Sequence, residues 1–192
     1  MPTMQAEKLT KIAHTTPREV SQRADLSADA LAFVGSAPDA ETFVRTLLAH
    51  ECYSDAAKFL AHALPKREAV WWGVLVVRGQ LGNPAPAPAA NILAAAERWV
   101  RQPTDEHRRA AMELAEPNLG DPAGFVGLAA FMSGGSLAPV GVDPVPPPEH
   151  LTGTLIGNAV ILAAVCKDPV TAPAKYRSFI EKGFEIARGP AR

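Results

Sequence analysis

Two apolar runs joined by a proline-rich segment occupy residues 121–166, and they constrain the fold more than any other part of the chain. The first run begins with Asp121 and Pro122, a helix-capping residue followed by a proline suited to the first helical position. The second run, Leu151–Cys166, has 16 residues, whereas a membrane-spanning helix needs about 20 apolar residues. Both runs therefore predict core helices, around which the remaining helices are expected to pack.

Helical spacing of apolar residues continues through most of the chain from Asp39 onward. One predicted helix, residues 66–79, is apolar on all faces around Trp71 and Trp72, so it must be central. A buried strand over residues 74–77 is the alternative, because short apolar runs do not distinguish the two. The sequence predicts an all-α fold, a compact array of seven to nine antiparallel helices, over about residues 40–50, 55–64, 66–79, 89–101, 105–116, 122–132, 151–166 and 171–188.

Glycines mark both apolar runs. Gly124 and Gly127 leave a surface without side chains on the first run, and Gly153 and Gly157 do the same on the second. Because such surfaces let helix backbones approach closely, we expect the two helices to pack back to back through these glycines.

Domain organisation follows from length and composition. A chain of 192 residues with 47% hydrophobic content can bury one substantial core. Residues 1–38 are polar, contain two prolines and offer only a short helical stretch at 26–34, capped by Ser27. We therefore predict a loosely attached N-terminal segment, 1–38, and a single helical domain, 39–189.

The charge balance excludes partners recognised by a strong global field. Nineteen basic and twenty acidic residues give a net charge of −1, so nothing steers the chain to nucleic acid or to an anionic membrane. Residues 1–8 lack the basic-then-apolar order of a signal peptide. We expect a cytoplasmic protein with no nucleic-acid partner and no membrane insertion; its oligomeric state is left open.

Cysteine, histidine and glycine motifs do not define a chemical site. Cys52 and Cys166 form neither a disulfide framework nor a zinc signature, and we expect both to be buried, reduced thiols. The chain has no HExxH, GxGxxG or Walker sequence. We assign no catalytic, metal-binding or cofactor-binding residue. The five histidines, none spaced four residues from another, are His14, His50, His62, His107 and His150.

A cluster of cations crosses the junction between two predicted helices. It could face an acidic partner or a phosphate, but a solvated helical face is the favoured interpretation, because neighbouring acids balance it. The cations are Arg98, Arg101, His107, Arg108 and Arg109, and the acids are Glu97, Asp105, Glu106 and Glu113.

The segment between the two apolar runs is the candidate contact surface. Five prolines lie between Pro139 and Pro148, with valines among them, which predicts a stiff, ordered, extended ridge that loses little entropy on docking. The opposing interpretation is a loop that braces two helices of its own domain. We assign as partner-binding residues Val140, Val142, Val145, Pro146, Pro147 and Pro148.

Three further stretches carry a family resemblance: residues 64–73, LPKREAVWWG; residues 131–139, FMSGGSLAP; and residues 146–153, PPPEHLTG. Together they resemble an uncharacterised bacterial family of unknown function that is associated with type VI secretion gene neighbourhoods. The resemblance covers about residues 40–170 and transfers no catalytic residue. It implies bacterial origin and an accessory role in a secretion apparatus.

These features favour a non-enzymatic adaptor or scaffold that binds a protein partner. The alternative is a small-molecule binding protein or hydrolase using the Ser133–His150 loop, where Gly134-Gly135-Ser136-Leu137-Ala138 loosely resembles a nucleophile elbow. That motif needs a preceding strand and a following helix, which the sequence does not predict here. A pocket that joined Ser136, His150 and a carboxylate would favour the alternative.

Overall fold

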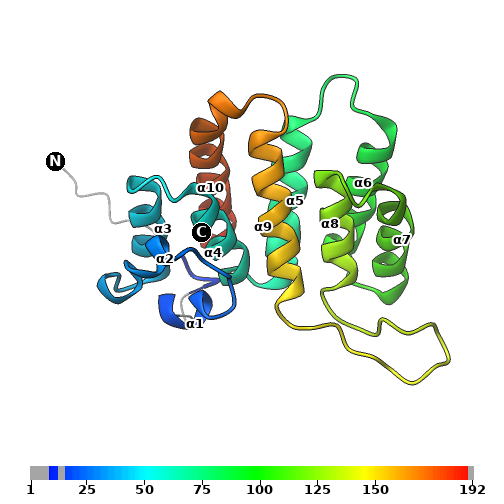
Figure 1. The fold of residues 1–192 in the computed structure, drawn as a ribbon. Helices are drawn as coiled ribbons and strands as arrows, with labels where there is room; N and C mark the ends of the chain where they lie inside the picture. The colour runs from blue at the N-terminus through cyan, green and yellow to red at the C-terminus, as the bar shows by residue number, and fades with distance from the viewer. Residues whose placement is uncertain (1–8, 13–15, 190–192) are drawn as a thin grey trace.

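The computed structural model describes residues 9–12 and 16–189, and throughout them the fold is all-α, without a strand (Figure 1). Ten α-helices and three 3₁₀ turns occur in this part of the chain, and eight of the α-helices have ten or more residues. This confirms the all-α prediction, and the strand alternative is wrong because residues 74–77 lie inside α5. The α-helices are α1 Pro17–Ser21, α2 Ala28–Leu31, α3 Ala40–Ala49, α4 Tyr53–Ala63, α5 Lys66–Gln80, α6 Ala87–Arg101, α7 Asp105–Ala115, α8 Pro122–Phe131, α9 Leu151–Val165 and α10 Ala172–Arg188.

The helices form two groups on either side of a central pair (Figure 1). The pair α5 and α9, which lacks a charged face along most of its length, packs together at the centre. On one side α9 packs against α4, and α10 packs against α4, α5 and α9; on the other, α8 packs against α9 and joins α6 and α7. Helices α8 and α9, which carry no charged residue, therefore lie between the amphipathic helices α4 and α10 on one side and α6 and α7 on the other.

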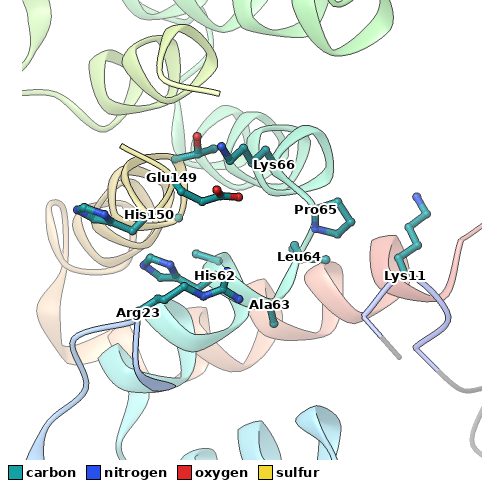
Figure 2. Close-up of a pocket in the computed structure, with 12 residues that line it drawn as sticks. Lys11, Arg23, His62, Ala63, Leu64, Pro65, Lys66, Glu149 and His150 are labelled. Atoms are coloured by element: carbon teal, nitrogen blue, oxygen red, sulfur yellow. The ribbon is translucent and has the colours of Figure 1, made fainter. Parts of the chain in front are cut away.

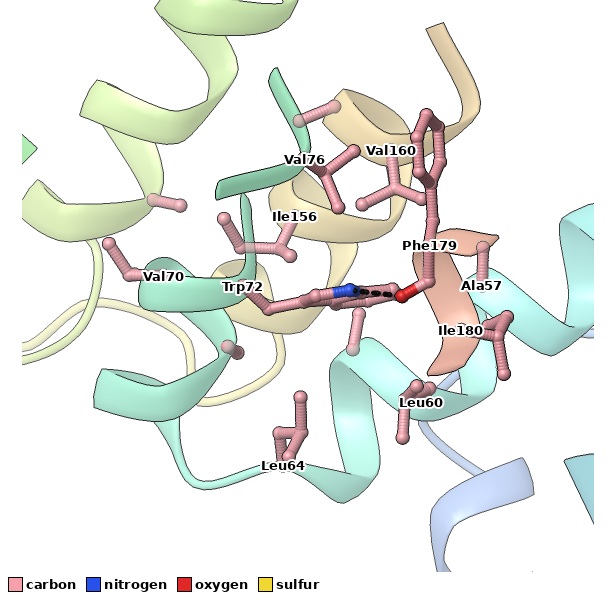
Figure 3. Close-up of a cluster of buried hydrophobic side chains, with 14 of the residues drawn as sticks. Ala57, Leu60, Leu64, Val70, Trp72, Val76, Ile156, Val160, Phe179 and Ile180 are labelled. Atoms are coloured by element: carbon pink, nitrogen blue, oxygen red, sulfur yellow. Dashed lines mark hydrogen bonds between the residues drawn. The ribbon is translucent and has the colours of Figure 1, made fainter. Parts of the chain in front are cut away.

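Trp72 of α5 lies at the centre, packed among side chains of α4 and α10 (Figure 3). Its side chain is fully buried, and its indole Nε1–H donates a hydrogen bond of 2.8 Å to the carbonyl of Phe179 in α10. Gly183 makes this approach possible, because a Cβ there would lie 2.5 Å from Leu60 Cδ2 and 3.2 Å from Trp72 Cε2. Trp71, on the neighbouring face of α5, is only half-buried.

The prediction about the four glycines is half right. Helices α8 and α9 are indeed neighbours. Their glycines, however, face away from each other: a Cβ on Gly127 would lie 2.8 Å from Ile92 Cγ2 of α6, and one on Gly157 would lie 3.3 Å from Lys58 Cα of α4. The prediction of a back-to-back glycine contact is therefore wrong. The glycines of α8 and α9 instead allow close packing of other helices, α6 against α8 and α4 against α9.

Residues 16–38 contact α4 through helix α1 and through one buried acid. Val20 and Ala30 are fully buried. The buried carboxylate of Asp55 in α4 accepts hydrogen bonds from Ser27 N at 2.8 Å and Ser27 Oγ at 3.0 Å. The Ser27 hydroxyl also caps α2, as the sequence predicts. The domain boundary at residue 38 stays a prediction.

Two smaller predictions can be compared with the described residues. Cys52 is half-buried, but Cys166 is exposed because it lies at the C-terminal end of α9, so its predicted burial is wrong. The signal-peptide prediction falls on residues 1–8, outside the described residues, as does His14. Across the described ranges, no single helix is long and apolar enough to cross a membrane; α9 and residues 169–188 reach that length together, but are bent by 116°.

Candidate functional site

The proline-rich loop between α8 and α9 extends away from the helical body (Figure 1). Backbone and hydroxyl contacts close its base: Leu137 N donates to Val145 O at 2.8 Å, and Val145 N donates to Ser136 Oγ at 2.9 Å. Within the projecting part, Val142 N donates to Pro139 O at 3.3 Å. The loop is thus a closed protrusion with defined internal contacts.

Arg108 of α7 anchors the near end of this loop. Its side chain is 3% exposed, and its guanidinium donates to Phe131 O and to Ser136 O, each at 2.7 Å. The same group lies 4.4 Å above the Phe131 ring, and it is paired with Asp105 Oδ1 at 2.5 Å. One buried cation therefore ties the end of α8 to the first residues of the loop.

A second arginine and a glycine complete the anchor. Arg109 Nη2 donates to Ala138 O at 2.8 Å, and its Nε donates to Asp105 Oδ2 at 2.7 Å. Hydrogen bonds from Arg109 and then Arg108 lower the pKa of the Asp105 carboxyl. Gly135 has a φ of +66°, and a Cβ there would lie 2.9 Å from Arg108 Nε. Only glycine fits this conformation and this space.

The far end of the loop is held by α9. The buried hydroxyl of Thr152 donates to Met132 O at 3.1 Å, which joins the two helices that carry the loop. The chain between Met132 and Thr152 is therefore fixed at both ends, and the projecting residues lie between these fixed points.

The predicted partner-binding residues lie on this protrusion. Val140, Val142 and Val145 are 84%, 60% and 52% exposed. Pro146 and Pro148 are also exposed, whereas Pro147 is half-buried. Of the seven large hydrophobic side chains that are exposed in the described part of the chain, these three valines fall within six residues.

A separate cavity of about 450 Å³ lies where α4, α5 and α9 meet the N-terminal segment (Figure 2). It is lined mostly by polar side chains from parts of the chain that are far apart in sequence. Those that carry or can carry charge are Lys11, Arg23, His62, Lys66, Glu149 and His150. The sequence motifs did not indicate this grouping.

His62, at the end of α4, is half-buried, as is Lys66, whereas the other charged or titratable groups of the lining are exposed. Its ring packs against Gly153 of α9, where a Cβ would lie 2.6 Å from His62 Nδ1, and its Nε2 lies 3.4 Å from Thr154 Oγ1. Burial lowers the pKa of His62 to about 4, helped by the nearby charges of Arg23 and His150. The imidazole is therefore neutral at pH 7.

The remaining sequence-level candidates do not gather into a chemical site. Ser136 Oγ accepts hydrogen bonds from Ala138 N and Val145 N, and it does not line the cavity that His150 lines. Within the described residues, no three His, Cys, Asp or Glu side chains are placed to hold a metal ion. Arg108, interpreted from sequence as part of a solvated face, is buried, so that interpretation is wrong for this residue.

The fold and these surfaces define a helical protein with an anchored apolar protrusion and a separate basic cavity. The chain belongs to a family of unknown function (DUF6931), whose model matches residues 43–187. No curated protein and no solved structure matches it.

Proposed function

We propose that this chain is a non-enzymatic adaptor that binds a protein partner through the loop of residues 136–148. The observation that carries the proposal is the outward exposure of Val140, Val142 and Val145 on a loop whose base is fixed by Arg108. A side chain that braced the fold would be buried against a helix. These valines are exposed instead.

The anchoring of the loop favours docking for an energetic reason. A flexible segment loses conformational entropy when a partner orders it, whereas a loop already fixed by hydrogen bonds and prolines loses little. Extended proline-rich segments typically bind apolar grooves lined by aromatic side chains. The partner in this proposal is a folded protein with such a groove.

The cellular setting is part of the same proposal. The resemblance to a bacterial family associated with type VI secretion gene neighbourhoods supports an accessory role for this adaptor in a secretion apparatus. We place the encounter with the partner in the bacterial cytoplasm.

The alternative of a hydrolase that uses the Ser133–His150 loop has less support. The only loop residues that line the cavity are Glu149 and His150, and the Ser136 hydroxyl is occupied by two backbone N–H groups. An activated serine needs its base within hydrogen-bond reach. The adaptor is therefore the better-supported function.

The test is a comparison of two variants in the native host. In the loop variant Val140, Val142 and Val145 all become Ser; in the control, Val170→Ser changes a valine that is 89% exposed at a distant 3₁₀ turn. Affinity purification should recover a protein with the wild type and the control but not with the loop variant. Direct binding should then be reproduced with purified components.

Thermal unfolding of the same variants distinguishes docking from bracing. Surface substitutions usually change stability by less than about 0.5 kcal/mol each, so the loop variant should melt close to the wild type. Loss of stability without loss of a partner would make the loop a brace and would refute the adaptor proposal.

A further inference from the structure

The cavity between α4, α5 and α9 carries an excess of positive charge. Three permanent cations line it, Lys11, Arg23 and Lys66, against one carboxylate, Glu149. With both histidines counted as neutral, three positive charges and one negative charge leave the lining at +2. The whole chain has a net charge of −1, so this excess is a local feature.

Two of these cations have no strong partner. Lys11 pairs with Glu68 at 3.1 Å, but neither Lys66 nor Arg23 forms a hydrogen bond or ion pair with another described residue. Lys66 is half-buried, at the first position of α5. Arg23 lies near enough to the Glu19 carboxylate to help lower the pKa of that group, so Glu19 offsets part of the charge of Arg23. An anion between Lys66 and Arg23 would relieve the repulsion that remains among the positive charges of the lining.

The arrangement of side chains and helix N-termini around the cavity also favours an anion. Figure 2 shows Arg23 and His62 on one side of the cavity and Lys66, Glu149 and His150 on the other. Helices α5 and α9 both begin at its wall, through Lys66 and through Thr152 and Gly153, and neither has a side-chain cap. Helix N-termini favour negative charge, which adds to the effect of the side chains.

We propose that this cavity binds a small phosphorylated organic molecule, whose phosphate is held between Lys66, Arg23 and His62. A phosphate accepts several hydrogen bonds, charge-assisted where the donor is a cation, which suits two cations and one neutral imidazole that line the cavity from three separate elements. The proposal is independent of the docking loop, because none of its phosphate-binding side chains belongs to residues 136–148.

The volume and lining of the cavity beyond the phosphate position indicate the chemistry of the organic part of the ligand. Its volume of about 450 Å³ lies within the range of sites for small organic molecules, and is larger than a phosphate alone requires. The polar lining disfavours an apolar ligand. Glu149 accepts hydrogen bonds, so the organic part is a hydroxylated group such as a sugar.

The Gly153–His62 contact keeps the site in place. Because the His62 ring lies directly on the α9 backbone, its orientation is fixed before a ligand arrives. In the neutral tautomer that carries its proton on Nδ1, Nε2 accepts from Thr154 Oγ1 and the Nδ1–H is left to donate to a phosphate oxygen. A nearby phosphate would also stabilise the protonated ring, so binding should raise the pKa of His62 from its value of about 4.

The test is an NMR titration of the full chain at pH 7 with ribose 5-phosphate, inorganic phosphate and ribose. Ribose 5-phosphate should shift the amide signals of Lys66, Thr152 and Gly153 in a saturable way and bind more tightly than inorganic phosphate. Ribose should leave these signals unchanged. Absence of any saturable shift with ribose 5-phosphate, or equal binding of ribose, would overturn the proposal.

Charge variants localise the binding. Lys66→Gln and Arg23→Gln should each weaken ribose 5-phosphate binding by about tenfold, since a hydrogen bond to a charged group typically supplies at least that factor. Lys182→Gln removes the same charge from α10, where Lys182 pairs with Glu185 outside the cavity, and should leave the affinity unchanged. Equal weakening by all three variants would show a nonspecific charge effect and refute the site.

Two controls test the stability of the variants and the source of the phosphate. The melting temperatures of the Lys66 and Arg23 variants should match the wild type, because these side chains form no hydrogen bond or ion pair with another described residue. Sedimentation with phosphatidylglycerol vesicles tests a lipid headgroup as the source of the phosphate, and we expect no binding. Sedimentation that depends on Lys66 would overturn the assignment to a small molecule.

Discussion

Replacing Arg108 by Met tests whether one buried cation fixes the docking loop. Methionine keeps a long apolar stem against Phe131 but removes the guanidinium. The carbonyls of Phe131 and Ser136 then lose donors at 2.7 Å, and Asp105 loses one of its two arginine partners.

The expected loss of unfolding free energy depends on which hydrogen-bond partners each polar group keeps after the substitution. A hydrogen bond from a charged donor is worth about 1.5–3 kcal/mol net. Ser136 O keeps a bond from Arg109 Nη2 at 3.2 Å, and Asp105 keeps Arg109 and is 51% exposed. Phe131 O loses its charged donor, and Phe131 is itself buried. Removing the burial cost of the guanidinium offsets part of this loss. We expect a net decrease in unfolding free energy of about 2–3 kcal/mol.

Two measurements check this prediction. Urea unfolding gives the change in free energy, with Arg101→Met as the control, because that side chain is 75% exposed and should cost less than about 0.5 kcal/mol. Amide hydrogen exchange at Leu137 reports the base of the loop, and its protection should fall in the Arg108 variant. An Arg108→Met protein with unchanged unfolding free energy and unchanged Leu137 protection would refute the anchoring role.

Three further predictions concern the core and the cavity. Trp72→Ala should lower the unfolding free energy by about 3–5 kcal/mol in urea titrations, whereas half-buried Trp71→Ala should cost clearly less; equal losses would contradict the central role of Trp72. Gly153→Ala should cost about 1–3 kcal/mol by forcing His62 aside, while Gly79→Ala, with open space around it, should stabilise α5 by up to about 1 kcal/mol. A stable Gly153→Ala protein would exclude the close ring contact. His62 has a folded pKa of about 4, below the 6.5 of an unfolded histidine, so its contribution is fully present above pH 6.5 and is lost as the pH falls toward 4. Because the ring is partly solvated, we expect His62 to contribute only about 1–2 kcal/mol to the unfolding free energy. Urea unfolding between pH 4.5 and 7 measures this contribution, and the His62→Asn variant should show a weaker dependence of unfolding free energy on pH. If the wild type and the His62→Asn variant showed the same dependence of unfolding free energy on pH, His62 would not be the cause of that dependence.

The helices could be predicted because their signals are local. Asp39 accepts a hydrogen bond from Thr42 N at 2.8 Å, and Thr104 accepts one from His107 N at 3.2 Å, so both caps are confirmed. Helix α6 begins at Ala87, two residues earlier than predicted, with Pro88 within its first turn. A proline there is compatible with a helix, and composition alone could not separate that position from the preceding connector.

The anchor and the cavity could not be predicted, because both depend on which helix faces each charged side chain. Arg108 and Arg101 both have an acid nearby in sequence, yet one is buried under a loop 28 residues further along the chain and the other is solvated. The spacing of charges along a helix gives no information on this difference. The cavity joins residues from the N-terminal segment to α9, and no short motif spans that distance.

The loop and the cavity depend on different side chains, although they share one boundary. The loop ends at Glu149 and His150, which line the cavity, but its base is held by Arg108 and Arg109 on α7, which do not. A substitution at Arg108 should therefore release the loop while the amides of Lys66 and Gly153 still respond to ribose 5-phosphate. Conversely, Lys66→Gln should weaken that response and leave partner binding by Val140, Val142 and Val145 intact. Each proposal can therefore be refuted without refuting the other.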